Sequence, residues 1–60
     1  MRSEIVKLAV KIGKRFGVRY STAPDNVRRA LYRTALKEML GFEATKEGLE
    51  QEIRISKEKI

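Results

Sequence analysis

Apolar side chains recur with the period of an α-helix over the first sixteen residues, and this periodicity constrains the fold more than any other feature. At about 100° per residue, the apolar side chains share one arc and the basic ones fill the opposite arc. The apolar arc holds Ile5, Val6, Leu8, Ala9, Val10, Ile12, Gly13 and Phe16, and the basic arc holds Lys7, Lys11, Lys14 and Arg15. Ser3 suits the N-cap, and Gly17 suits the C-terminal stop. The pattern predicts an amphipathic helix over about residues 3–16.

A second helical period follows a stretch, residues 17–23, that has no regular pattern and is predicted to be a loop. Thr22 is expected to cap the new helix, with Asp25 reaching back as in a capping box and Pro24 in the first turn. The expected apolar face holds Leu31, Tyr32, Ala35, Leu36, Met39 and Leu40. Gly41 suits the left-handed position after a helix, where Phe42 can fold back. We therefore expect a helix over about residues 23–40.

The last third of the chain has two interpretations. Leu49 and Ile53 share a helical stripe, and Thr45 precedes it as a potential cap. The alternation of apolar and polar residues from 49 to 55, with Gly48 before it, is also compatible with a strand. We favour a helix over about residues 46–57. The expected fold is then all-α: two amphipathic helices in a helix-turn-helix-like hairpin, followed by a C-terminal helix.

The residue types present exclude most enzyme chemistry. The 60-residue chain has no Cys and no His, which removes thiolate nucleophiles, the imidazole base and the commonest metal ligands. It contains no glycine-rich phosphate loop or nucleophile elbow. We therefore expect no enzyme activity, no metal and no cofactor. A chain this short buries only about 60% of its unfolded surface, so a partner or a second copy is expected to help complete the core.

The length of the apolar stretches indicates where in the cell the protein is expected. Lys7 and Lys11 interrupt the first one, which argues against a secretory signal, and no stretch approaches the ~20 apolar residues of a membrane span. We expect a cytoplasmic protein with no membrane association. Charged residues make up 37% of the chain while Asn and Gln occur once each, a bias typical of proteins from hot environments.

Charge is distributed unevenly along the chain. Residues 1–37 carry ten basic side chains and two acidic ones, a net charge of +8, whereas residues 38–60 carry four basic and six acidic ones, a net charge of −2. Two basic helix faces joined by a loop that contains Arg19 and Tyr20 are typical of proteins that bind a polyanion. We therefore divide the single domain into a basic nucleic-acid-binding unit, residues 1–40, and an acidic amphipathic tail, residues 41–60.

Part of the basic unit resembles a known DNA-binding motif. Ile12, Gly13, Phe16, Gly17 and Val18 follow the order of apolar, small and turn residues in the first half of a helix-turn-helix unit. Residues 24–35 look like the second helix of trihelical regulators such as the DNA-binding domains of sporulation response regulators. The resemblance covers about residues 8–40, and its connection, residues 17–24, is longer than the usual turn. It implies that the small residue at position 13 permits a close helix crossing and that the second helix is the recognition helix.

These arguments predict a nucleic-acid interface. The resemblance implies that the early residues of the second helix approach base edges: Asp25, Asn26, Arg28 and Arg29. Capping is the alternative role of Asp25 and Asn26, and we favour it for Asp25. Phosphates would be held by Arg33, Lys37, Lys7, Lys11, Lys14 and Arg15, and Tyr20 would stack on an unpaired base or ribose or pack over the core edge. The candidate residues are Lys7, Lys11, Lys14, Arg15, Arg19, Tyr20, Asn26, Arg28, Arg29, Arg33 and Lys37. Phe16, Tyr32 and Phe42 are expected in the core.

Three functions remain open at this point. The first is a helix-turn-helix-like DNA-binding protein or transcriptional regulator, with residues 42–60 as a candidate dimerisation or partner-binding segment. The second is a ribosomal or other ribonucleoprotein subunit that binds the RNA backbone. The third is an interaction module or small inhibitor that docks on an acidic protein. The sequence does not distinguish DNA from RNA, and it specifies neither the nucleotide sequence bound nor the oligomeric state.

Overall fold

Three α-helices and one short 3-10 helix make up the part of the chain that the structure describes. The structure is a computed structural model, which describes the backbone of residues 3–58 and the side chains up to Lys57; Arg2 and Lys59 of the charge count lie outside it. The elements are α1 (Glu4–Arg15), η1 (Tyr20–Thr22), α2 (Asp25–Met39) and α3 (Lys46–Glu58). The expected all-α fold is confirmed, and residues 49–57 form a helix rather than a strand.

Local signals set both ends of α1. The Val6 N–H donates to the hydroxyl of Ser3 at 3.2 Å, so Ser3 is the expected N-cap. At the other end, Gly17 adopts a positive φ of 75°, and the Val18 N–H donates to the Gly13 carbonyl at 2.7 Å. This is the Schellman arrangement, in which a left-handed glycine turns the chain back onto the last helical turn. The glycine therefore ends α1 where the sequence predicts.

The start of α2 differs from the prediction. Pro24 occupies the N-cap position, and no side chain caps this end. Thr22 does not cap it because residues 20–22 form η1, whose turn is closed by the Ala23 N–H donating to the Tyr20 carbonyl at 3.4 Å. Asp25 forms an ion pair with Arg28 instead of completing a capping box. The helix accordingly begins two residues later than expected.

The connection from α2 to α3 follows the sequence prediction in its backbone. Gly41 has a φ of 102°, and the Phe42 N–H donates to the Lys37 carbonyl at 2.9 Å, which closes α2 in a second Schellman turn. The Phe42 side chain is 63% exposed, so the expectation that it joins the core is wrong. Thr45 then caps α3 as predicted, its hydroxyl accepting from the Gly48 N–H at 2.9 Å.

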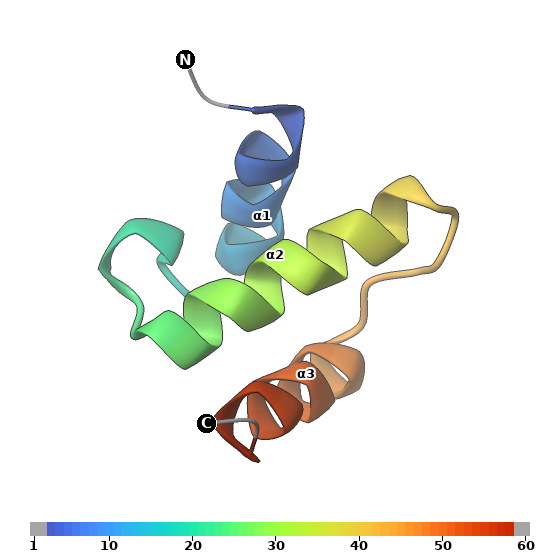
Figure 1. The fold of residues 1–60 in the computed structure, drawn as a ribbon. Coiled ribbons are helices and arrows are strands. Elements are labelled where there is room, and N and C mark those ends of the chain that lie inside the picture. The colour runs from blue at the N-terminus through green and yellow to red at the C-terminus, as the bar shows by residue number, and fades with distance from the viewer. Residues whose placement is uncertain (1–2, 59–60) are drawn as a thin grey trace.

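The core forms on both sides of α2, which lies between α1 and α3 (Figure 1). Its buried apolar residues are Ala9 and Ile12 of α1, Ala30, Leu31 and Ala35 of α2, and Leu49 of α3. Phe16 and Tyr20 are partly buried and pack against this cluster. Since Leu49 belongs to the cluster and Ile53 packs on it, the acidic tail itself completes the core of the chain.

The buried face of α2 is not the one that its large apolar residues predict. Leu31 and Ala35 are buried, but Tyr32 and Leu36 are 37% exposed, Met39 is 55% exposed and Leu40 is 77% exposed. Small residues, Ala30 and Thr34, take the buried side, and the Thr34 hydroxyl donates to the Ala30 carbonyl at 2.8 Å. A helix that packs against two neighbours needs a wide buried side, and small side chains let both neighbours approach. The expectation that Tyr32 lies in the core is therefore wrong.

Gly13 is buried where α1 meets its own outgoing chain. A Cβ at this position would lie 2.5 Å from the Val18 carbonyl oxygen, but at an ordinary 3.5 Å from Leu31 Cδ1 of α2. The contact with Val18 in the Schellman turn, rather than the contact with α2 at the helix crossing, therefore excludes a larger residue at position 13.

Within the described residues, none of the helices combines the length and the apolar character needed to cross a membrane.

Candidate nucleic-acid interface

Three arginines and two tyrosines surround one hollow on the surface. Its volume is about 330 Å³, and it is lined by Tyr20, Arg28, Arg29, Tyr32, Arg33 and Ser56. The lining surface is mostly apolar, and its residues come from η1, α2 and α3. We call it the tyrosine hollow. No acidic residue lines it within the described chain.

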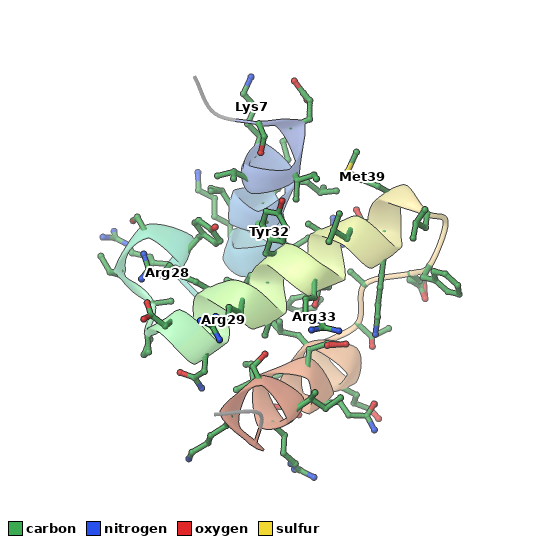
Figure 2. All side chains as sticks on the ribbon, in the orientation of Figure 1. Lys7, Arg28, Arg29, Tyr32, Arg33 and Met39 are labelled. Atoms are coloured by element: carbon green, nitrogen blue, oxygen red, sulfur yellow. The ribbon has the colours of Figure 1, made fainter. Side chains whose placement is uncertain are left out.

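The helical period of α2 explains why these side chains meet. Residues four apart lie on the same face of a helix, one turn from each other. Arg29 and Arg33 form one such pair, and Arg28 and Tyr32 form the other. Figure 2 shows these four side chains along the same stretch of α2. Tyr20 reaches the hollow from η1, because the long connection between α1 and α2 packs against both helices.

The three arginines differ in their charge environment. Arg28 is paired with Asp25 of the same helix, and the Arg33 Nε lies 3.6 Å from Glu52 Oε2 of α3. Arg29 is exposed and has no ion-pair partner among the side chains that the structure describes. Positive charge that an incoming anion can neutralise is therefore concentrated on Arg29.

Glu52 links two of the predicted phosphate-binding residues to α3. Its side chain is only 7% exposed, and its Oε1 accepts a hydrogen bond from Lys37 Nζ at 2.6 Å. Its other oxygen, Oε2, is buried and accepts no hydrogen bond, with Arg33 just beyond hydrogen-bond distance. Arg33 and Lys37 thus hold α3 against α2 in addition to any role toward a ligand.

The sequence analysis treated residues 41–60 as an acidic amphipathic tail, assigned no role to any single acid in it, and so missed Glu52. A usable signal was present, because Leu49, Glu52, Ile53 and Ser56 fall at positions i, i+3, i+4 and i+7 of one helix face. Glu52 and Ser56 are both buried on the face that carries Leu49. A carboxylate on an apolar stripe indicates a buried ion pair, here with cations four residues apart on α2.

A second hollow adjoins the first. Its volume is about 280 Å³, and it is lined by Val10, Lys14, Val18, Arg19, Tyr20 and Ser21. Tyr20 lines both hollows and therefore stands between them. Lys14 and Arg19 are exposed and carry no ion pair among the described side chains. Because Tyr20 belongs to both linings, the two hollows together bring basic residues of α1, the connection and α2 to neighbouring parts of the surface.

The remaining predicted residues lie elsewhere. Lys7 and Lys11 line a separate hollow with Glu4, Leu8 and Met39, and Lys7 Nζ lies 3.8 Å from Glu4 Oε1. Arg15 pairs with Glu38 of α2 at 3.4 Å. Asn26 is half-buried and is not among the residues that line either hollow beside Tyr20. The structure therefore groups Lys14, Arg19, Tyr20, Arg28, Arg29 and Arg33, together with Tyr32, and leaves the other candidates apart.

The described residues contain no group of three or more metal-ligating side chains that could hold an ion. Comparison of the chain with protein-family models, curated proteins and solved structures gave no match.

Proposed function

We propose that this chain is a small nucleic-acid-binding protein and that the tyrosine hollow and the hollow beside it form its binding surface. The observation that carries the proposal is the gathering of three arginines and two tyrosines around one hollow that no acidic side chain of the described residues lines. Cations neutralise phosphates, and aromatic rings stack on bases, which is the combination that nucleic-acid surfaces use. The net charge of +6 favours association with any polyanion.

Two forms of this function are open, a helix-turn-helix-like DNA-binding regulator and a ribonucleoprotein subunit. For the first, α2 would be the recognition helix in the major groove. Among its early residues, Asp25 and Arg28 neutralise each other and Asn26 is half-buried. Arg29 alone is then left exposed and unpaired among the described side chains to read a base. The basic and aromatic hollow suits either nucleic acid, so its geometry supports the broader function more strongly than the regulator.

Fluorescence anisotropy tests the proposal with labelled duplex DNA, single-stranded DNA and structured RNA at about 50 and 200 mM salt. We expect binding that weakens steeply with salt. Arg29→Ala should weaken binding about threefold to tenfold and lower the salt slope by about one, because one phosphate contact is lost.

Arg54→Ala is the matched control, since Arg54 is exposed on α3 and lines neither hollow beside Tyr20. Both variants remove one positive charge, but only the first should lower the salt slope. Absence of binding to all three nucleic acids at the lower salt concentration would reject the proposal. In that case docking on an acidic protein becomes the better explanation of the basic surface.

A further inference from the structure

We infer that the tyrosine hollow takes an unpaired nucleotide, its base against Tyr20 and Tyr32 and its phosphate on Arg29. The inference rests on the proposed function and names the class of ligand for the same surface. Phosphate binding alone needs exposed cations and no hollow. The hollow is mostly apolar, has a volume of about 330 Å³ and lies between arginines. It therefore suits a flat apolar group that carries an adjacent negative charge. A nucleobase attached to its phosphate has both properties.

The two tyrosines are placed differently, and each placement suits stacking. Tyr20 is partly buried and packs against the core, so its ring is held in position. Tyr32 is 37% exposed and does not belong to the core cluster. Little side-chain conformational entropy is lost when a base stacks on a ring that is already held in position, and an exposed ring is accessible to a base. Ser56 adds a hydroxyl to the lining, a group able to hydrogen-bond a base edge.

Duplexes do not fit this arrangement. Their bases are stacked on each other inside the helix, so only phosphates and groove edges meet a protein surface. An unpaired base in a single strand, loop or bulge is free to leave the stack and lie on an aromatic ring. The hollow on the other side of Tyr20, with Lys14 and Arg19, extends the surface by a place for a neighbouring phosphate. Single strands of RNA and DNA share this chemistry.

The test compares wild type with Tyr32→Leu, which removes the ring and keeps an apolar side chain. Anisotropy is measured with single-stranded RNA, single-stranded DNA of the same sequence, and the corresponding duplexes. We expect wild type to bind single strands more tightly than duplexes, and Tyr32→Leu to lose about 5- to 100-fold on single strands with little change on duplexes. The RNA and DNA strands show which sugar is preferred.

Three further variants keep the test decisive. Tyr32→Phe retains the ring and should bind single strands as wild type does. Leu36→Ala is the matched control, because Leu36 lies one turn from Tyr32, is equally exposed at 37%, and does not line the hollow. Tyr20→Leu probes the second ring if Tyr32→Leu does not fold by circular dichroism. Equal losses on single strands and duplexes, or no loss on either, would overturn this inference and leave nucleic-acid binding intact. Absence of all binding rejects both proposals.

Discussion

At position 13 the local backbone leaves room for glycine alone. Its missing Cβ leaves room for the Val18 carbonyl, which would otherwise lie at 2.5 Å. Forcing an extra methyl into a packed site costs about 1–3 kcal/mol, and the upper part of this range applies here because the contact is with backbone. Alanine's better helix propensity offsets up to about 1 kcal/mol of this cost, so we expect Gly13→Ala to lower the free energy of unfolding by about 1–2 kcal/mol. Urea denaturation followed by circular dichroism measures the change.

Gly48→Ala provides the comparison, because Gly48 lies in the first turn of α3 with only the Thr45 hydroxyl nearby, at 3.0 Å from a built Cβ. An alanine there gains helix propensity but crowds the capping hydroxyl, so stability should change by less than about 1 kcal/mol in either direction. If both substitutions had the same effect, the close approach of Val18 would not explain Gly13. The sequence resemblance identified position 13 as a place for a small residue. The reason for the glycine is the Val18 carbonyl, which the turn after α1 brings against it.

Among the helices, four of the predicted end signals were right, whereas the capping box at the start of α2 and the buried face of α2 were predicted wrongly. Ser3, Gly17, Gly41 and Thr45 act through contacts within a few residues, and each performs its predicted role. Which side of α2 is buried depends on where α1 and α3 pack. The apolar periodicity within α2 does not predict the positions of those helices. The largest apolar residues of α2 therefore misled the prediction, and the grouping of Tyr20 with Tyr32 was not foreseen.

Glu52 is the polar connection between α2 and α3, and its removal tests how that contact is held. Glu52→Gln should destabilise the domain by about 1–2 kcal/mol, a value between those of exposed and buried ion pairs, because Arg33 and Lys37 are half-exposed and regain water. A loss of that size lowers the melting temperature by about 4–8 °C for each kcal/mol. Thermal unfolding by circular dichroism measures it.

The same substitution should strengthen nucleic-acid binding. Arg33 lines the tyrosine hollow, and release from Glu52 leaves its charge available to a phosphate, adding about 0.9 to the salt slope. Glu50→Gln removes the same charge from an exposed position on α3 and should change neither stability nor slope near physiological salt. A Glu52→Gln variant that matched Glu50→Gln in both measurements would contradict the assigned ion pairs.

Across the whole molecule, the exposed acidic residues Glu47 and Glu50 of α3, unlike Glu52, should influence binding only over long range. Glu47 and Glu50 precede Ser56, the α3 residue of the hollow, by about 14 and 9 Å along the helix at 1.5 Å per residue. These separations exceed the Debye length of ~8 Å at 0.15 M salt but not that of ~30 Å at 0.01 M. Glu47 and Glu50 are exposed on α3 and line neither hollow beside Tyr20. Replacing both with Gln raises the formal net charge of +6 by two without touching the proposed surface.

We therefore expect the Glu47→Gln/Glu50→Gln double variant to associate with a single strand several-fold faster at about 0.01 M salt and at the wild-type rate at about 0.15 M. Arg29→Ala should weaken binding at both salt concentrations, because a direct contact is screened much less than a distant charge. Stopped-flow fluorescence measures the association rates. Faster association of the double variant at the higher salt concentration would mean that the strand passes close to Glu47 and Glu50, and the binding surface would then have to extend from Ser56 toward the first turn of α3.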